Sequence, residues 1–261
     1  MSTLVDIGAN LTHDTFDEDR QDVLQRARDA GVTQVIVTGT SIDGSEKALQ
    51  LAREHDGLFA TAGIHPHHAD ETSIEAMNRL ETLSTDERVK AIGETGLDFF
   101  RDYSPRKDQI ASFEDHLALA IKTRLPLFLH ERDAWPVFTE VLRSCRNELT
   151  NVVVHCFTGD QNALHAYLDL DCHIGITGWI CDERRGTHLI PLIRDIPDNR
   201  LMIETDAPYL LPRSIRPKPK SRRNEPYYLT VVCKAVASAR GETYDELARQ
   251  TSANAVRFFD I

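Results

Sequence analysis

The sequence has few cysteines and no pattern that would join them. Its five cysteines form no C-x-x-C pair and are odd in number, which argues against a disulfide framework or a zinc ribbon and favours a reducing compartment. No window approaches the roughly 18 apolar residues of a membrane span. The first residues, MSTLVDIGANLTHD, lack a basic segment followed by an apolar run. We therefore expect a cytoplasmic protein without a membrane span.

The motifs of serine and nucleotide-cofactor chemistry are missing as well. There is no G-x-S-x-G elbow, no P-loop, and no G-x-G-x-x-G after a strand, so nucleophilic serine and dinucleotide chemistry are disfavoured. A net positive charge is also absent, because the formal charge is −11. Proteins that coat DNA through bulk charge are basic. Binding of nucleic acid would therefore need cations concentrated at one place.

Short, nearly continuous apolar runs recur along the chain, with helical segments between them. The runs end near Asp6, Thr38, Ala62, Gly93, His130, His155, Gly175 and Glu204. Successive ends are separated by roughly the 30 residues of one βαβ unit, and uniformly apolar strands are typical of parallel sheets covered on both faces. We expect a single domain, 1–261, with an α/β fold: a (β/α)8 barrel of the TIM type. An open doubly wound sheet is the alternative.

Two of the intervening helices have recognisable ends. Phe16 to Ala30 carries apolar residues at helical spacing, and Gly31 follows as a C-terminal cap. Ser104 and Pro105 supply an N-cap and a first-turn proline for the next clear helix.

Polar residues stand at the carboxyl ends of five of these strands, where barrel enzymes place their active sites. They are His65, Glu94 between two glycines, His130, His155 and Asp206. Imidazoles combined with carboxylates suit Mg²⁺, Zn²⁺ or Mn²⁺, and such an ion lowers the pKa of bound water to about 7. We expect Glu94, His130, His155 and Asp206 to bind a divalent metal. Glu94, Asp206 and His65 would take part in catalysis.

Three other polar residues near these strand ends are given lesser roles. Glu204 lies inside the last strand and is expected to support a ligand. His67 and His68 are expected to be solvated loop residues.

A cationic segment follows the last strand. No acidic residue occurs from Ala207 to Asn224. Six cations do: Arg213, Arg216, Lys218, Lys220, Arg222 and Arg223. The pair Arg184 and Arg185 follows the seventh strand, and loops after strands seven and eight of a barrel commonly bind phosphate.

We expect part of this set to bind substrate phosphates: Arg213, Arg222, Arg223, Arg184 and Arg185. Trp179 and Tyr209 flank the segments and could stack bases. A solvated charged loop with aromatic packing at its rim is the alternative.

Seven motifs follow one another along the chain: GIHPH, AIGETGLDF, LPLFLHERDA, VVHCFTG, IGITGWICDERRG, IETDAPYLLP and SRRNEP. Through these motifs the sequence resembles the TatD family of metal-dependent deoxyribonucleases. The resemblance covers essentially the whole chain and implies an amidohydrolase-like barrel. It further implies that the protein is a 3′–5′ exonuclease on single-stranded DNA or RNA, that it is a monomer, and that it takes part in DNA repair. It also implies that Glu94, His130 and His155 are metal ligands, Asp206 the strand-eight acid and His65 the histidine of the strand-three loop.

The first strand departs from the family pattern. Many members carry D-x-H-x-H there, whereas this chain has Asp6, Gly8 and Asn10 in the corresponding places, so a fully occupied two-metal site is in doubt. Two rival interpretations stay open. One is a barrel amidohydrolase that cleaves a small-molecule C–N bond, and the other is a non-catalytic barrel adaptor.

Overall fold

The structure is a computed structural model that describes residues 3–261. The chain divides into two compact units. Unit 1 holds the described residues up to Val37, then Cys156–Asp160 and Ile174–Ile261. Unit 2 holds Thr38–His155 and Gln161–His173.

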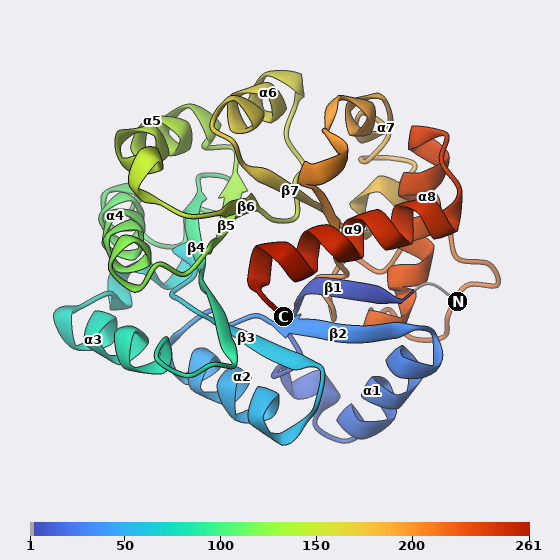
Figure 1. The fold of residues 1–261 in the computed structure, drawn as a ribbon, viewed down its shortest axis with the longest axis horizontal. Coiled ribbons are helices and arrows are strands. Elements are labelled where there is room, and N and C mark those ends of the chain that lie inside the picture. Colours follow the sequence, from blue (N-terminus) through green and yellow to red (C-terminus); the bar gives the residue numbers. More distant parts are fainter. Residues whose placement is uncertain (1–2) are drawn as a thin grey trace. The chain divides into compact units, whose positions relative to one another are not determined.

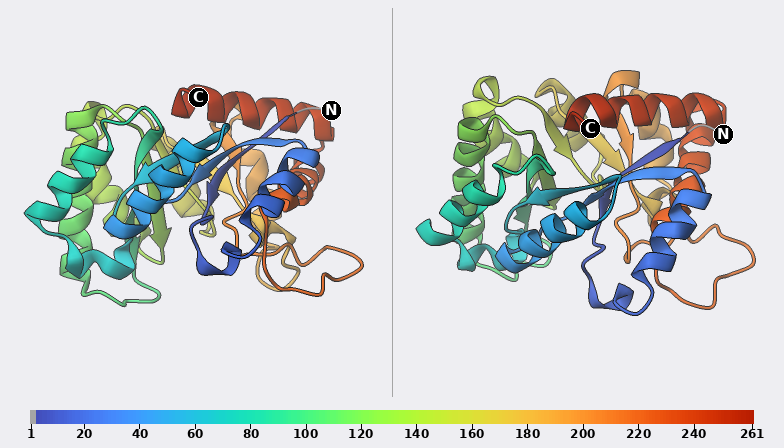
Figure 2. Two further views of the ribbon diagram at one scale, coloured as in Figure 1. Left: turned by 90° about the horizontal axis from the view of Figure 1, so that it is seen from below. Right: turned by 60° about the horizontal axis from the view of Figure 1, so that its bottom comes forward.

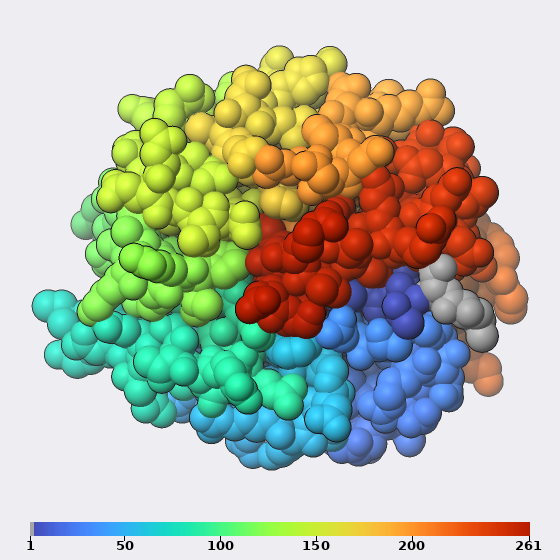
Figure 3. All heavy atoms as spheres, in the orientation of Figure 1, coloured from blue at the N-terminus to red at the C-terminus, as the bar shows by residue number. Residues whose placement is uncertain are grey.

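Unit 1 combines the first two and the last two strands with the helices around them. Its strands are β1 (Leu4–Ala9), β2 (Val32–Val37), most of β7 (His173–Ile176) and β8 (Leu201–Ile203). Its helices are α1 (Arg20–Asp29), α7 (Leu189–Leu192), α8 (Leu229–Arg240) and α9 (Tyr244–Phe259), with short 3-10 turns that include η4 (Gly178–Cys181) and η7 (Pro226–Tyr228). Helix α9 runs alongside β1 (Figure 1) and forms one continuous surface with α8 (Figure 3).

Unit 2 contains the four middle strands. They are β3 (Leu58–Ala62), β4 (Val89–Asp98), β5 (Leu127–Arg132) and β6 (Val152–Val154). The helices are α2 (Ile42–Glu54), α3 (Ile74–Leu83), α4 (Arg106–Thr123), α5 (Trp135–Cys145) and α6 (Gln161–Asp169), and the 3-10 segment η2 (Pro66–Glu71) follows β3. Phe113 of α4 stacks on Phe138 of α5 with ring centroids 5.0 Å apart, which joins the two helices through buried aromatic surface.

Over residues 3–261 the strands form one eight-stranded sheet in chain order, β1 to β8. The described pairs, such as β4 with β5 and β7 with β8, are parallel. Within Unit 1 the last strand also neighbours the first, through a parallel bridge between Ala9 and Ala207. Parallel strands in this cyclic order, alternating with helices, define a (β/α)8 barrel. The predicted fold class is confirmed.

Two of the expected helix starts need correction, and one expected helix end is confirmed. Helix α1 begins at Arg20 rather than Phe16, because Asp14–Phe16 forms a separate 3-10 turn. Ser104 does not cap α4: Pro105 occupies the N-cap position, and the Ser104 hydroxyl donates to the carbonyl of His67 at 3.0 Å. Gly31 does end α1 with a φ of 88°.

The fourth strand is longer than its apolar run. It continues through GETGLD to Asp98, and the four residues from Thr95 to Asp98 pair with the four successive residues of β5 from Leu129 to Arg132. Its register shifts between Ile92 and Thr95, so Glu94 sits at an irregularity inside the strand instead of beyond its end. No helix in the described part of the chain is long and apolar enough to cross a bilayer.

Candidate metal centre and cationic pocket

Glu94 is placed by backbone contacts inside Unit 2. Its N–H donates to the carbonyl of Gly39 at 2.7 Å, and its side chain is 6% exposed. His155 follows β6 directly and donates its own N–H to the carbonyl of Leu129 in β5 at 2.9 Å. The main chain after β2 and the main chain of β5 thus fix the backbone positions of Glu94 and His155, respectively.

Four side chains of Unit 2 meet around this carboxylate, and we name them the histidine cluster: His65, Glu94, His130 and His155. Glu94 Oε1 lies 2.8 Å from His155 Nε2, 3.0 Å from His130 Nδ1 and 3.3 Å from His65 Nε2. His65 Nδ1 accepts the backbone N–H of His67 at 3.1 Å. The neutral His65 ring therefore carries its proton on Nε2, directed into the cluster.

The electrostatics of the cluster favour an ionised carboxylate. Burial alone would raise the pKa of Glu94, but electrostatic interactions with His155 and His65 and hydrogen bonds from His130 and His155 hold that pKa well below its usual range. Burial lowers the pKa of His65 to about 4, so this ring is neutral at pH 7. Burial would also lower the pKa of His130, but hydrogen bonds to Asp98 and Glu94 outweigh it and raise that pKa to about 9.

Asp98 and His67 lie at the same site, although the sequence analysis gave Asp98 no role and expected His67 to be a solvated loop residue. His67 Nε2 lies 2.7 Å from Asp98 Oδ2, so the expectation that His67 is a solvated loop residue is wrong. His68 does remain on the surface, with a side chain 50% exposed. Two sequence signals for this pair exist, since Asp98 ends the GETGLD motif and His67 lies two residues after His65. Only the full length of β4, which extends to Asp98, shows that the two residues lie close together.

The donor set fits a divalent metal. His65, Glu94 and His130 each place a nitrogen or oxygen atom within 4.8 Å of the other two, and of these atoms the protonated His65 Nε2 faces the carboxylate as a hydrogen-bond donor. Ligand atoms about 2.1 Å from one ion in a tetrahedral arrangement lie about 3.4 Å apart. Glu94 Oε1 lies 3.0 Å from His130 Nδ1 and 2.8 Å from His155 Nε2, so these side chains would move apart by about half an ångström to admit an ion. The His and Glu side chains therefore offer the N/O type of donor set that could hold Zn²⁺, Mn²⁺ or Mg²⁺.

Asp206 belongs to Unit 1, where β8 ends. It has a φ of 54°, and its N–H donates to the carbonyl of Gly8 at 2.8 Å. Its Oδ1 accepts a hydrogen bond from Asn10 Nδ2 at 3.0 Å. Glu204, fully buried two residues earlier, accepts the N–H of Cys156 at 2.5 Å. Both carboxylates are thus oriented by the backbone and side chains of β1 and of the segment after β6.

Asp6 is a fully buried carboxyl beneath this strand end. Its Oδ1 accepts the N–H of Thr205 at 2.9 Å, and its Oδ2 lies 2.5 Å from the Thr205 hydroxyl. Burial raises the pKa of Asp6 to about 8, against the hydrogen bonds of Thr205 and Gly8, which lower it. The carboxyl is therefore protonated in the folded protein at neutral pH and can donate to Thr205 Oγ1.

Replacing Asp6 with asparagine should flatten the pH dependence of stability. The pKa of Asp6 is about 8 in the folded protein, whereas the ordinary pKa of aspartate is 3.8. Compared with the unfolded state, the folded state therefore binds one additional proton between these two pH values. Its stabilisation is complete below about pH 4 and is lost as the pH rises to about 8. Asparagine keeps the Oδ1 acceptor and an N–H donor, so the wild-type slope should exceed that of Asp6→Asn by up to about 1.4 kcal/mol per pH unit. Urea unfolding between pH 5 and pH 8 measures both slopes, and equal slopes would show that Asp6 is ionised.

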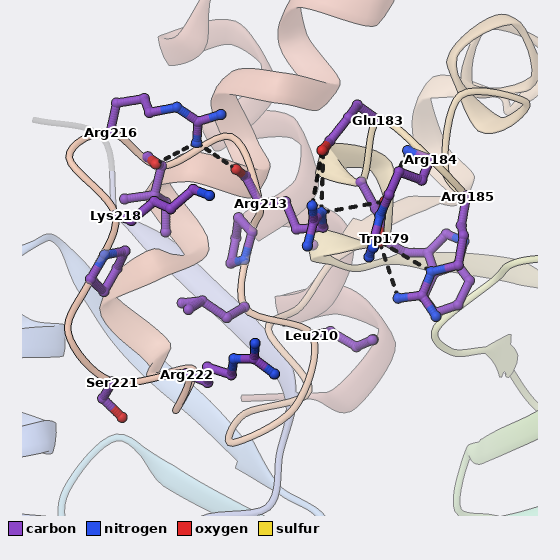
Figure 4. Close-up of a pocket in the computed structure, with 16 residues that line it drawn as sticks. Trp179, Glu183, Arg184, Arg185, Leu210, Arg213, Arg216, Lys218, Ser221 and Arg222 are labelled. Carbon is purple, nitrogen blue, oxygen red and sulfur yellow. Dashed lines mark hydrogen bonds and ion pairs between the residues drawn. The ribbon is translucent and has the colours of Figure 1, made fainter.

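A cationic pocket of about 520 Å³ lies in Unit 1, between η4 and the loop after β8 (Figure 4). Six cations line it: Arg184, Arg185, Arg213, Arg216, Lys218 and Arg222. The loop that carries four of them extends from the strands of Unit 1 (Figure 2). The only carboxylates in the lining are Asp182 and Glu183, so the pocket is strongly positive in a chain of net charge −11.

Asp182 organises one wall of the cationic pocket. Its buried carboxylate accepts from Arg185 Nε and Nη2, each at 3.1 Å, and from the N–H of Arg184 at 2.9 Å. Burial would raise its pKa, but these bonds lower it to about 2. Arg185 also lies over the Trp179 ring, 4.3 Å from its centroid. The side chains of Arg184 and Arg185 remain 59% and 56% exposed, so they are held in place and still face solvent.

Arg222 and Arg223 differ sharply despite being adjacent. Arg222 is exposed, lines the pocket, and makes no hydrogen bond or ion pair with the described residues. Arg223 binds both oxygens of Asp19, at 2.8 and 2.6 Å, and Glu225 at 2.9 Å. The hydrogen bonds to these carboxylates raise the pKa of Arg223 further above its usual range. Arg223 therefore anchors the loop to the start of α1, while Arg222 presents a free charge.

The fold and the histidine cluster together define a metal-binding enzyme class built on a (β/α)8 barrel. Residues 5–260 match the model of the TatD related DNase family, and the chain belongs to this family. It is 48% identical over 259 residues to a protein of Pantoea ananatis named 3′-5′ ssDNA/RNA exonuclease TatD, covering 99% of this chain and 100% of that one.

Two solved structures are similar over nearly their full lengths. YJJV, a TatD homologue from Escherichia coli k12, has a TM-score of 0.90 at 28% identity, with 99% of this chain and 98% of that chain covered. An uncharacterized amidohydrolase from Saccharomyces cerevisiae has a TM-score of 0.86 at 23% identity, with coverage of 99% and 100%, and shows the shared fold. The expected membership of the TatD family and the amidohydrolase-like barrel are both confirmed.

Proposed function

We propose that this protein is a metal-dependent 3′–5′ exonuclease that hydrolyses phosphodiester bonds in single-stranded DNA or RNA. The observation that carries the proposal is the histidine cluster, in which Glu94 Oε1 lies within 3.0 Å of nitrogens of both His130 and His155. The relative from Pantoea ananatis, whose name states this activity, matches along the entire chain. The role in DNA repair stays a prediction from the family resemblance.

We assign the residues of the histidine cluster and Asp206 different roles in this reaction. Glu94, His130 and His155 hold a divalent ion, for which Mg²⁺ is our first assignment, and Asp206 stays the predicted fourth ligand. When bound, the ion polarises the phosphate and makes water nucleophilic at neutral pH. His65, neutral and protonated on Nε2, supplies a hydrogen-bond donor beside the carboxylate. We further propose that the chain works as one catalytic domain and as a monomer in the cytoplasm.

The cationic pocket holds the substrate strand. Arg184, Arg185 and Arg213 are fixed by the carboxylates of Asp182 and Glu183, whereas Arg222 and Lys218 are exposed and unpaired among the described residues. Free cations bind phosphates and release counterions, so these two should contribute most to affinity. Trp179, under Arg185, provides an aromatic face for a base.

The double variant Arg222→Ala/Lys218→Ala should weaken binding of single-stranded DNA and reduce its salt dependence. Each lost phosphate contact removes about 0.7 from the slope of log affinity against log salt for single strands, so two contacts remove about 1.4. Fluorescence anisotropy of a labelled oligonucleotide between 50 and 200 mM salt, about the range over which such binding falls steeply, measures the slope. The matched control is Lys234→Ala/Arg249→Ala, two exposed cations on α8 and α9. Equal slopes in both double variants would identify the pocket as an ordinary solvated face.

The rival amidohydrolase function makes a different prediction in a direct comparison of substrates. The same metal-loaded preparation is offered single-stranded oligonucleotides and a panel of small amides. We expect hydrolysis of the oligonucleotides alone, since amide cleavage has no use for six cations around one pocket. Turnover of an amide with no attack on nucleic acid would favour the amidohydrolase, and turnover of neither would favour the adaptor.

A further inference from the structure

Asp98 lies beside the histidine cluster but contacts it through only one of its oxygens. Its Oδ1 accepts the backbone N–H groups of Phe100 and Arg101, at 3.1 and 2.8 Å, and so closes the turn after β4. Its Oδ2 faces two imidazoles, with His67 Nε2 at 2.7 Å and His130 Nε2 at 3.5 Å. One carboxylate thus has a turn-closing oxygen and a histidine-facing oxygen.

The position of this carboxylate is fixed from behind. Gln109 of α4 accepts the N–H of Asp98 at 2.8 Å and donates to its carbonyl at 3.2 Å. Gln109 is fully buried and Asp98 is 2% exposed. The main chain of Asp98 is therefore clamped to α4, and its side chain has little freedom to turn toward solvent.

His130 needs a partner on the side that faces away from Glu94. Its Nδ1 points at Glu94 Oε1, the position from which a metal would be bound. Its Nε2 is buried and forms no hydrogen bond of ordinary length with the described residues, because the carboxylate oxygen that faces it, Asp98 Oδ2, lies 3.5 Å away, beyond the usual distance of about 2.9 Å. A ring that binds metal through Nδ1 carries its proton on Nε2, where this oxygen is the available acceptor.

We propose that Asp98 is a positioning residue, which accepts the Nε2–H of His130 and thereby turns the Nδ1 lone pair of that ring toward the metal. The inference rests on the metal site of the proposed function and assigns a role to a residue outside the ligand set. His67 Nε2 contacts the same oxygen, Asp98 Oδ2, and helps to hold the carboxylate in position. This contact is not required to set the tautomer of His130.

The test is the affinity of metal-stripped protein for Zn²⁺, measured by calorimetry or by competition with a chelator. Asp98→Asn keeps an oxygen for the Phe100 and Arg101 N–H groups but offers an N–H donor to His130, which favours the tautomer with its proton on Nδ1. We expect Asp98→Asn to bind Zn²⁺ 10- to 100-fold more weakly, the typical effect of losing such a partner. His67→Phe, which removes the other imidazole from Oδ2, should stay within about threefold of wild type.

Two outcomes would overturn the proposal: wild-type affinity in Asp98→Asn, or an equal loss in His67→Phe. Nitrogen-15 NMR of the Zn²⁺-loaded wild-type protein gives an answer that does not depend on how any variant folds. We expect His130 to be protonated on Nε2, and a proton on Nδ1 would contradict the assignment. If the wild-type protein bound no Zn²⁺, both the inference and the proposed metal site would fail, whereas normal binding in Asp98→Asn would remove the inference alone.

Discussion

Replacing Glu94 with glutamine should lower kcat/KM on single-stranded DNA by at least about 10³-fold, or about 4 kcal/mol of transition-state stabilisation. Glu94 Oε1 lies within 3.3 Å of a nitrogen of each of the three imidazoles in the cluster. Glutamine keeps the size of the side chain and removes its negative charge, so the metal loses its central anionic ligand. Steady-state kinetics at saturating Mg²⁺ measure the loss.

The control for this variant is Glu87→Gln, which makes the same chemical change at an exposed residue just before β4. It should retain wild-type kinetics. Circular dichroism of both variants shows whether the fold is kept. Activity of Glu94→Gln within about tenfold of wild type, in a preparation free of contaminating nuclease, would show that the histidine cluster is not the reaction centre.

Substituting Gly96 with alanine should destabilise the protein by about 3 kcal/mol or more, because two penalties add. Gly96 has a φ of 139°, a conformation that side chains rarely adopt. A Cβ at this position would also meet the carbonyl oxygen of His130 at 2.0 Å. The backbone of β5 would have to move at His130, which is a proposed metal ligand, so metal affinity should fall together with stability.

Gly241 provides the matched control. It too has a positive φ, 75°, where it ends α8, but a Cβ there would have no neighbour within 4 Å. Gly241→Ala should therefore cost only the conformational preference, about 1 kcal/mol. Urea unfolding of both variants separates the clash from the backbone preference. Equal destabilisation would mean that contact with β5 contributes nothing at Gly96.

Much of the fold could be predicted from the sequence because the strands are uniformly apolar and regularly spaced. The polar ends of those strands gave His65, Glu94, His130 and His155, which the structure gathers around one carboxylate oxygen. The sequence did not predict a role for Asp98, because the apolar run ends near Gly93. In the structure, hydrogen bonding to β5 continues the strand through GETGLD. Where the last residues of a strand are polar because they belong to a functional site, apolar patterning cannot show that the strand continues.

The two adjacent arginines show a second limit. Arg222 and Arg223 are equivalent in sequence, but Arg223 pairs with Asp19, which lies 204 residues earlier in the chain. No local sequence pattern can predict an ion-pair partner so far away along the chain. The same applies to Asp182, whose neighbours Arg184 and Arg185 suggest a free basic pair, although the buried carboxylate holds both guanidinium groups.

The proposed exonuclease activity is tested most directly by a time course on a 5′-labelled single-stranded oligonucleotide with metal-stripped protein, before and after Mg²⁺ is restored. We expect no cleavage in EDTA and, with Mg²⁺, a ladder of labelled products that shortens stepwise from the 3′ end. Glu94→Gln should give no ladder under either condition. Cleavage that persists in EDTA, or immediate release of a labelled mononucleotide from the 5′ end, would contradict the proposed activity.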